Sequence, residues 1–361
     1  MTTQPIDHTA VDSLIDFPLA VTVARGLLRP GPKVDARQAR EVVDELRADA
    51  VASTGHVQAV TGLRAKPGDG VLVVDRRGWV QANADAFRAI LAPAVDQAMK
   101  ARPGTNPGVL AVGRKATGSE VGALLAFLGS RVLGQYDIAG PSSVTGAGGR
   151  LLLVAPNIVQ VERDLDVDPS DFRLWVCLHE ETHRVQFAAC DWLRGHLLES
   201  SSALVSDLLG RPGEVVERVS NAARALPDLV RSDGNTSLLD LIQTPEQRRH
   251  LAQLTATMSL LEGHADVVMD EAGPEVIGSV KQIRDRFTVR RQGAGALDRL
   301  LRRLLGLEAK MRQYRDGAIF VRGVVAEAGM DGFNQVWTSP DALPRPEEIL
   351  QPRAWVQRVL D

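Results

Sequence analysis

The chain has 361 residues and a formal net charge of −3, from 42 basic and 45 acidic side chains. This length is enough to bury a large core, in one domain or in two. The balanced charge provides no basic field, so the composition does not favour a nucleic-acid partner. No stretch approaches the roughly 18 uncharged apolar residues of a membrane span, and no membrane segment is expected.

The first residues of the chain and its two cysteines indicate the cellular compartment of the protein. Residues 1–9 contain no Lys or Arg, so a secretory signal is not expected. Cys177 and Cys190 lie thirteen residues apart on or near one predicted helix, roughly 20 Å along its axis and too far apart for a disulfide. Two free thiols are typical of a reducing compartment, so we expect a cytoplasmic protein.

The first hundred residues are predicted to be mainly helical. Apolar residues recur at helical spacing over residues 35–63 and 83–101, the second with an interruption near Pro93. Between them, the apolar run 70–75 predicts a short strand, and residues 75–78 predict a turn after it.

The rest of the chain continues the helical pattern with one further strand. A loop rich in Gly and Ser is expected at 138–149, and the apolar run 151–158 predicts a strand just before the most informative helix. The predicted helices are 116–134, 171–191, 192–209, 213–226, 245–270, 275–288 and 294–329. The fold class predicted is mainly α with a small β component (α+β).

A loop rich in Pro and Gly, residues 102–108, is the best candidate for an internal boundary. It would divide a mainly helical region, 1–106, from a region that carries the metal-binding motif, 107–361. The alternative is one continuous domain.

The most informative motif is the pentad His179-Glu180-Glu181-Thr182-His183, an H-E-x-x-H sequence inside an apolar helix. Residues four apart lie one turn apart on the same face, so both imidazoles can reach one metal ion. Glu180 lies about 100° further round, close enough to contact a metal-bound water without being a ligand. This arrangement is typical of zinc hydrolases: two nitrogen ligands, an open position and a carboxylate base.

The residues after the pentad exclude one class of third ligand. The longer pattern H-E-x-x-H-x-x-G-x-x-H requires Gly and His where this chain has Gln186 and Ala189. The third ligand is therefore predicted to come from a later helix, and the best candidate is Glu262. Glu199 and His196 are the alternative candidates for the third ligand.

The surroundings of Glu262 predict a supporting role for a second carboxylate. Asp266 lies four residues further on, on the same helical face, and could accept the free ring N–H of a ligand histidine. His264 is about 200° from Glu262 on a regular helix, so the two are not expected to bind the same ion. By the same geometry Cys177 faces away from His179 and is predicted to be a small buried hydrophobe.

These residues resemble a known family. Residues 174–187, together with blocks at 73–80, 133–137, 261–266, 313–314 and 336–337, resemble an actinobacterial family of zincin-like metallopeptidases. Its members are described as hydrolases associated with the biosynthesis of the deazaflavin redox coenzyme. The resemblance covers about residues 16–349. It implies a zincin-like architecture and a zinc site, without implying that the chain binds the coenzyme.

The predicted chemistry assigns a role to each residue. Zinc held by His179, His183 and Glu262 would activate a water, and Glu180 would act as the general base. The oxyanion needs a further electrophile, for which the candidates are Tyr136, Tyr314, His264 or an arginine. Of these, Tyr314 is assigned the catalytic role.

The substrate class is open at this stage. A peptide is the first expectation, and we predict that it pairs in extended form along the strand at residues 151–155. A small-molecule amide is an alternative substrate. A non-catalytic zinc-binding accessory protein is a further alternative, which an intact Glu180 disfavours because a structural site needs no base.

Overall fold

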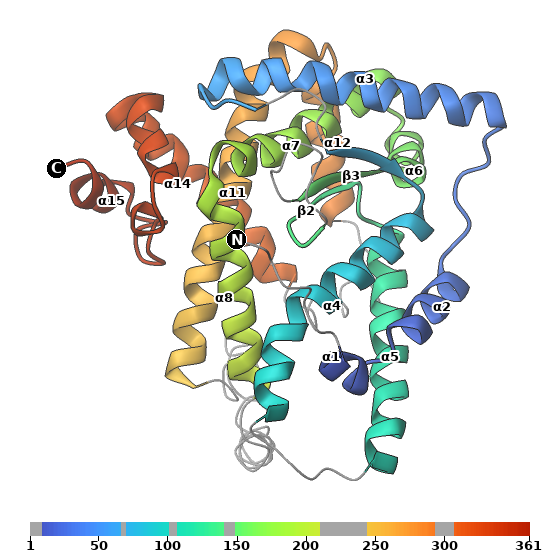
Figure 1. Cartoon of the computed structure of the whole chain (residues 1–361). Coiled ribbons are helices and arrows are strands. Elements are labelled where there is room, and N and C mark those ends of the chain that lie inside the picture. Colours follow the sequence, from blue (N-terminus) through green and yellow to red (C-terminus); the bar gives the residue numbers. More distant parts are fainter. Residues whose placement is uncertain (1–8, 66–69, 101–106, 141–148, 210–243, 293–306) are drawn as a thin grey trace, which may run out of the picture.

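The computed structural model describes residues 9–65, 70–100, 107–140, 149–209, 244–292 and 307–361 (Figure 1). It contains one small sheet of three strands, β1 (Val71–Val74), β2 (Gly134–Asp137) and β3 (Arg150–Val154). Their order is β1-β3-β2, with β1 parallel and β2 antiparallel to β3. The rest of the described chain is mainly helical, which confirms the predicted α+β class.

The central position of β3 contradicts one expectation. Both sides of β3 are paired, Leu151 with Val71 on one side and with Tyr136 on the other, and its apolar side chains are fully buried. The strand at residues 151–155 therefore cannot receive a substrate, and the prediction that it does is wrong. A buried central strand and an exposed edge strand of the same composition look alike in sequence. The outer strand next to the metal helix is β2.

Three helices precede the sheet: α1 (Thr9–Leu14), α2 (Phe17–Leu27) and α3 (Ala36–Thr61). The long helix α3 confirms the pattern seen at 35–63. It begins with a capping box in which Asp35 and Gln38 satisfy each other's backbone N–H groups. It ends at Gly62, whose φ of 72° is the left-handed conformation that glycine adopts readily.

The helix α4 (Arg76–Lys100) begins earlier than its sequence predicts. The turn expected at 75–78 is instead the first turn of this helix. Asp75 Oδ1 accepts the backbone N–H of Gly78 at 2.6 Å, and the Asp75 carbonyl accepts that of Trp79 at 3.0 Å. Asp75 thus caps the helix directly after β1. α4 continues through Pro93, so the interruption predicted at this residue is not present.

The next helices connect the strands and lead into the pentad. They are α5 (Pro107–Gly129), α6 (Ala155–Leu165), α7 (Pro169–Ala189) and α8 (Asp191–Leu209). Pro156 lies in the first turn of α6, where its missing N–H costs nothing, so the strand predicted to reach 158 ends at Val154. Asp168 caps α7 by accepting the N–H of Asp171 at 2.9 Å.

The last part consists of α11 (Pro245–Val276), α12 (Val280–Gln292), α14 (Leu307–Phe333), two short 3₁₀ helices at Asn334–Trp337 and Pro340–Ala342, and α15 (Pro352–Val359). Helices α8 and α11 lie side by side in Figure 1, and α14 packs against α11. The helix predicted at 213–226, most of the loop at 138–149 and nearly all of the boundary loop at 102–108 lie outside the described residues. The boundary at residue 106 stays a prediction, and the sheet combines strands from both sides of it.

The helix α3 lies across α7 at one end of the molecule (Figure 1). A buried polar cluster joins the two helices: Thr54 of α3 donates to Glu181 at 2.5 Å, and Glu181 also accepts from Arg184 at 2.8 Å. All three side chains are almost completely buried. Since a buried charge is costly unless paired, this cluster fixes the rotation of α7 about its axis.

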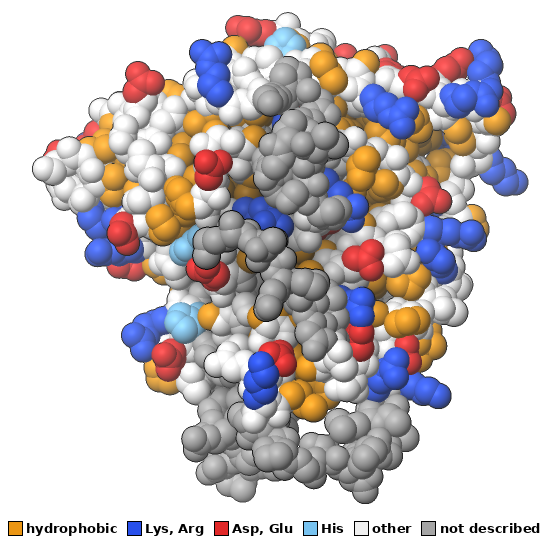
Figure 2. Space-filling model, viewed as in Figure 1, with side chains coloured by type: hydrophobic (Ala, Val, Ile, Leu, Met, Phe, Trp, Pro, Cys, Tyr) orange, Lys and Arg blue, Asp and Glu red, His pale blue; other side chains and the backbone are white. Residues whose placement is uncertain are grey.

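Three apolar clusters surround the site. The first joins α3, α6 and α7 to parts of α11 and α12, the second joins α8, α11, α14 and α15 to the end of α7, and the third joins α1, α2, α4 and α5 to the sheet. None of the helices in the described part of the chain has both the length and the hydropathy that a transmembrane span requires. On the face shown in Figure 2, acidic and basic side chains alternate over the surface.

Candidate metal centre

The helix α7 presents His179 and His183 on one face, one turn apart, as their spacing predicts. Their rings lie 4.9 Å apart between centroids and almost perpendicular to each other. The long helix α11 brings Glu262 to them, and Glu262 Oε2 is 3.5 Å from Nε2 of both histidines. Among the described residues, these three side chains form the one group of His, Cys, Asp or Glu that could hold a metal ion.

The donor set fits zinc. Tetrahedral zinc with bonds of about 2.0–2.1 Å holds its nitrogen and oxygen ligands roughly 3.3 Å apart, close to the 3.5 Å between Glu262 Oε2 and each Nε2. Glu262 Oε2 is buried and has no hydrogen-bond partner of acceptable geometry. A buried carboxylate oxygen without such a partner, facing two imidazole nitrogens, is an arrangement that a cation stabilises.

The charges of the ligands are coupled. Burial alone would raise the pKa of Glu262, but His183 and His179 hold that pKa well below its usual value, so the carboxylate is ionised. Burial lowers the pKa of His183, yet Glu262 and further partners outweigh it and raise the pKa to about 9. A metal that binds here therefore replaces a proton on His183.

The residue that orients His183 is Gln186. Its Oε1 lies 3.0 Å from Nδ1 of His183, while its Nε2 lies 3.0 Å from the carbonyl oxygen of Leu261 and 3.0 Å from Nδ1 of His264. The Leu261 carbonyl can only accept, so it orients the amide with Nε2 towards α11 and Oε1 towards His183. His183 then donates through Nδ1 and directs Nε2 at the metal position.

The same chain of contacts assigns the state of His264. Burial, with the nearby His183, lowers the pKa of His264 to about 3, so this fully buried imidazole is neutral. Its Nδ1 accepts from Gln186, and its ring packs against Phe333 and Trp337 at 5.2 and 5.4 Å between centroids. His264 is fully buried and does not line the cleft, which removes it as a candidate for oxyanion stabilisation.

Asp266 is paired with Arg322 and not with a ligand histidine, in contrast to the supporting role predicted for it. The Asp266 carboxylate lies on the exposed side of α11, 3.5 Å from Arg322 of α14. Spacing along α11 could not reveal this, because the relevant partner of His183 comes from α7 itself. The i,i+3 relation of His183 and Gln186 was visible in the sequence as a signal, since such pairs are neighbours on a helix.

Glu180 is buried beside the ligands and packs against the backbone of β2. A Cβ atom on Gly134 would lie 2.7 Å from Glu180 Oε1. Glycine at this position therefore leaves the room that the carboxyl group occupies. The side chain of Glu180 also lines the cleft, together with both histidines and Glu262, as a base next to the metal would.

The cleft has a volume of about 670 Å³ and lies between α7, α11 and β2. Tyr136 of β2 lines it, and its ring stacks on Phe187 at 4.6 Å between centroids. The side chain of Tyr314, in α14, lies outside the described residues, so its catalytic role stays a prediction. Cys177 is fully buried, and burial raises the pKa of its thiol, in agreement with the predicted apolar role.

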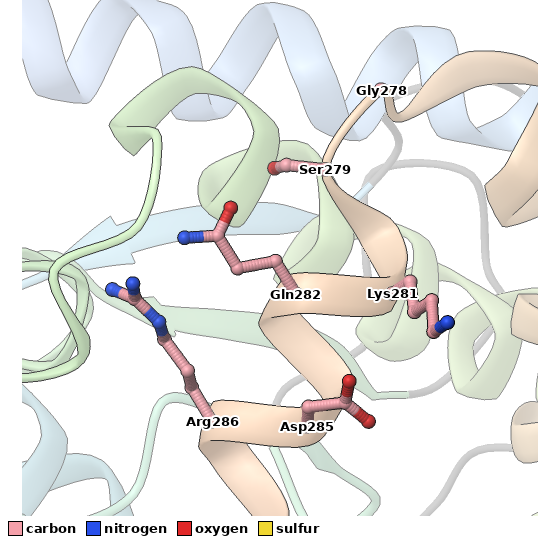
Figure 3. A pocket seen from close by; sticks show the side chains of 6 residues that line it. All are labelled: Gly278, Ser279, Lys281, Gln282, Asp285 and Arg286. Carbon is pink, nitrogen blue, oxygen red and sulfur yellow. The ribbon is translucent and has the colours of Figure 1, made fainter.

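A second hollow at the start of α12 has no comparable chemistry. Figure 3 shows that its side chains do not converge: Gln282 and Arg286 point to one side of the helix, and Lys281 and Asp285 to the other. Arg286 already donates to the carbonyl of Leu165 at 2.6 Å. This bond attaches α12 to the end of α6.

Comparisons with known proteins agree with this geometry. Residues 15–356 match the family described as Zincin-like metallopeptidase, and the chain belongs to this family. It is also similar to a protein from Chloroflexus aurantiacus whose crystal structure was described as that of a candidate hydrolase with a novel fold. The two are 32% identical, with a TM-score of 0.67, and the match covers 96% of this chain and 98% of the other.

A shorter likeness involves ATP synthase subunit delta of Streptomyces griseus subsp. griseus, at 34% identity over 145 residues. It covers 38% of this chain and 50% of that subunit, so the chain spans half the length of this relative. The family, the hydrolase relative and the His–His–Glu cluster together support a metal-dependent hydrolase.

Proposed function

We propose that the protein is a zinc metallopeptidase in which His179, His183 and Glu262 hold the metal and Glu180 is the general base. The observation that carries this proposal is the convergence of the three ligand atoms within 4.8 Å of one another, beside a glutamate that lines the same cleft. A purely structural zinc site would be closed by a fourth protein ligand and would need no base.

Each side chain has a defined task. When bound, zinc would lower the pKa of a coordinated water towards about 7 and polarise a substrate carbonyl. Gln186 holds His183 in the tautomer that binds metal. Glu180, whose carboxyl group is placed by the close contact with Gly134, would accept a proton from the attacking water and deliver it to the leaving amine.

The substrate is proposed to be a peptide that lies along β2. Gly134, Gln135 and Tyr136 of this outer strand line the cleft beside Glu180. An outer strand can pair with an extended peptide through main-chain hydrogen bonds. This replaces the central strand β3, which the sequence had suggested for the same purpose.

The test is a set of quenched peptides and small-molecule amides incubated with zinc-loaded protein, with and without a chelator. We expect peptide hydrolysis that the chelator abolishes. In Glu180→Gln we expect bound zinc to persist while hydrolysis falls at least about 100-fold, because the amide cannot act as a base. Loss of zinc in this variant would make Glu180 a ligand, and full activity would mean that another base operates.

The other outcomes separate the alternatives. Hydrolysis of amides without hydrolysis of peptides would favour a small-molecule amidase. Tightly bound zinc with no turnover of either substrate set would favour an accessory protein. A link to deazaflavin coenzyme biosynthesis and a cytoplasmic location stay predictions, which a deletion strain and fractionation of cells would test.

A further inference from the structure

The metal ligands belong to a longer stripe on α7. Trp175, His179, His183 and Phe187 follow one another at intervals of four residues, and all four side chains line the cleft. Residues four apart advance about 6 Å along a helix, so the two aromatic residues lie on opposite sides of the metal position, roughly 18 Å apart along the axis. Each ligand histidine thus has an aromatic neighbour on its outer side.

Each end of the stripe is extended by a second aromatic ring from another element. Trp175 packs edge-on against Phe287 of α12, with ring centroids 5.0 Å apart. Phe187 stacks on Tyr136 of β2 at 4.6 Å. Both partners also line the cleft. The cleft therefore has two aromatic walls, one on either side of the metal centre, in a chain with only 4% aromatic residues.

The cleft offers little charge with which to bind an ionic substrate group. Among the described residues that line it, the one charged side chain outside the metal site is that of Arg131. Its guanidinium lies 3.8 Å from the ring centroid of Phe127 and donates to the Phe127 carbonyl at 3.1 Å. A carboxylate transferred from water to either aromatic wall would lose its hydration without gaining a partner, and a cationic side chain would gain only a cation–π contact in its place.

We propose that the substrate carries a large apolar or aromatic group on each side of the scissile bond. One group would pack against Trp175 and Phe287, the other against Phe187 and Tyr136, while the carbonyl lies at the metal. This inference rests on the proposed function, because it assumes that the metal centre cleaves the bond between the two groups. The contact between apolar surfaces selects for size and shape on both sides.

The test uses peptides that differ at the two positions flanking the cleaved bond: Phe–Leu, Ala–Leu, Phe–Ala, Ala–Ala and Glu–Lys. We expect kcat/KM to fall roughly 10- to 100-fold when either apolar side chain is reduced to Ala, because an apolar pocket loses binding energy with each methylene group that is removed from the substrate. The charged pair should be cleaved more slowly still. Preference for small or charged residues at either position would overturn the proposal.

Variants of the two aromatic walls test which wall determines the preference on each side of the cleaved bond. Phe287→Ala should reduce the preference on one side only, and Phe187→Leu the preference on the other side, with circular dichroism and bound zinc unchanged. The matched control is Val289→Ala, on the same helix as Phe287 but 67% exposed and outside the cleft, which should leave both preferences intact. Unchanged preferences in both wall variants would contradict the assignment.

A binding measurement separates this inference from the proposed function. Titration calorimetry compares N-acyl-phenylalanine hydroxamate with its alanine analogue on zinc-loaded protein. If no peptide is cleaved but the phenylalanine compound binds at least 10-fold more tightly, with that advantage lost in one wall variant, the peptidase proposal fails and the aromatic cleft stands. Equal binding, or no binding, overturns the inference even if peptides are cleaved.

Discussion

Gln186 shows how one neutral side chain determines the state of two histidines. Its amide accepts from His183 and donates to His264 and to the Leu261 carbonyl. A carboxylate in this place would add a negative charge to the site, whereas the amide orients the ligand without doing so. A metal bound by these residues would have a single anionic ligand, Glu262, and would be a stronger Lewis acid for that reason.

Removal of the Gln186 amide tests this role. We expect Gln186→Met, which conserves volume but not hydrogen bonding, to weaken zinc binding roughly 10- to 100-fold. Asp266→Asn is the matched control and should change the affinity less than about 2-fold, because its carboxylate faces Arg322. Competition with a chromophoric zinc chelator measures both. An effect of Asp266→Asn as large as that of Gln186→Met would restore the role predicted from sequence.

Gly134 is expected to control the position of the general base. In Gly134→Ala, the new methyl group would overlap the end of the Glu180 side chain, closest to Cδ, and at 2.5 Å from Cγ and 2.7 Å from Oε1. The flexible end of Glu180 can move away at little cost in stability, so we expect kcat to fall at least about 10-fold with zinc still bound. The control is Gly55→Ala in α3, where a Cβ meets nothing within 4 Å, and activity should not change. A fully active Gly134→Ala would show that Glu180 need not occupy this position.

At the scale of elements, the ligand helix α11 is held in place by a close crossing with α14. Gly263, the neighbour of Glu262, lies against the backbone of Gly317, and a Cβ on either residue would overlap the other helix. Such contact requires glycine on both sides. The position of Glu262 relative to α7 therefore depends on the packing of three helices that are far apart in sequence.

The contact of α3 with α7 contains a carboxyl group that destabilises the fold at neutral pH. Burial, with the Glu45 carboxylate, raises the pKa of Asp49 to about 6, although Arg173 acts in the opposite direction. Its Oδ2 is buried without a hydrogen-bond partner among the described residues. Because the folded state binds the proton more tightly than the unfolded state, stability falls as pH rises from about 4 to about 6.

Asp49→Asn should remove this penalty. We expect a gain of about 1 kcal/mol in the free energy of unfolding at pH 7.5, after allowance for partial exposure, and almost no gain at pH 3.5, where Asp49 is mostly protonated in both states. Urea unfolding at the two pH values measures it. Glu41→Gln, an exposed change on the same helix, should alter stability by only a few tenths of a kcal/mol at either pH. An equal gain at both pH values would exclude ionisation as the cause.

At the scale of the whole molecule, metal binding joins the two halves of the site and should stabilise the fold. The ligands come from α7 and α11, two helices that lie far apart in the sequence and pack against each other. Zinc at about 100 times its Kd contributes roughly 2.7 kcal/mol, which corresponds to a rise in Tm of roughly 3–4 °C for a chain of 361 residues, at an unfolding entropy of about 2.1 cal/mol/K per residue. We therefore expect a chelator to lower the Tm by this amount in calorimetry. The double variant His179→Ala/His183→Ala should show no such shift.

The site residues that could be predicted from the sequence alone are those whose relative positions depend on a single helix. His179, Glu180 and His183 lie on one continuous helix, and 3.6 residues per turn are sufficient to place the two imidazoles together. Glu262 could be selected because few acidic residues interrupt an apolar helical run. The class of fold followed from the same periodicity, and the resemblance to zincin-like metallopeptidases from several blocks of residues together.

Tertiary structure decided what depends on contacts between distant segments. The interior position of β3, the outer position of β2 and the closeness of Gly134 to Glu180 follow from strand order, which the composition of a short apolar run does not encode. Asp266 and Gln186 were both within helical reach of a plausible partner, but only the rotation of α7 and α11 about their axes decides which side chain faces His183. That rotation is set by the packing of buried surfaces over the whole core, including the glycine crossing with α14 and the buried Thr54–Glu181–Arg184 cluster.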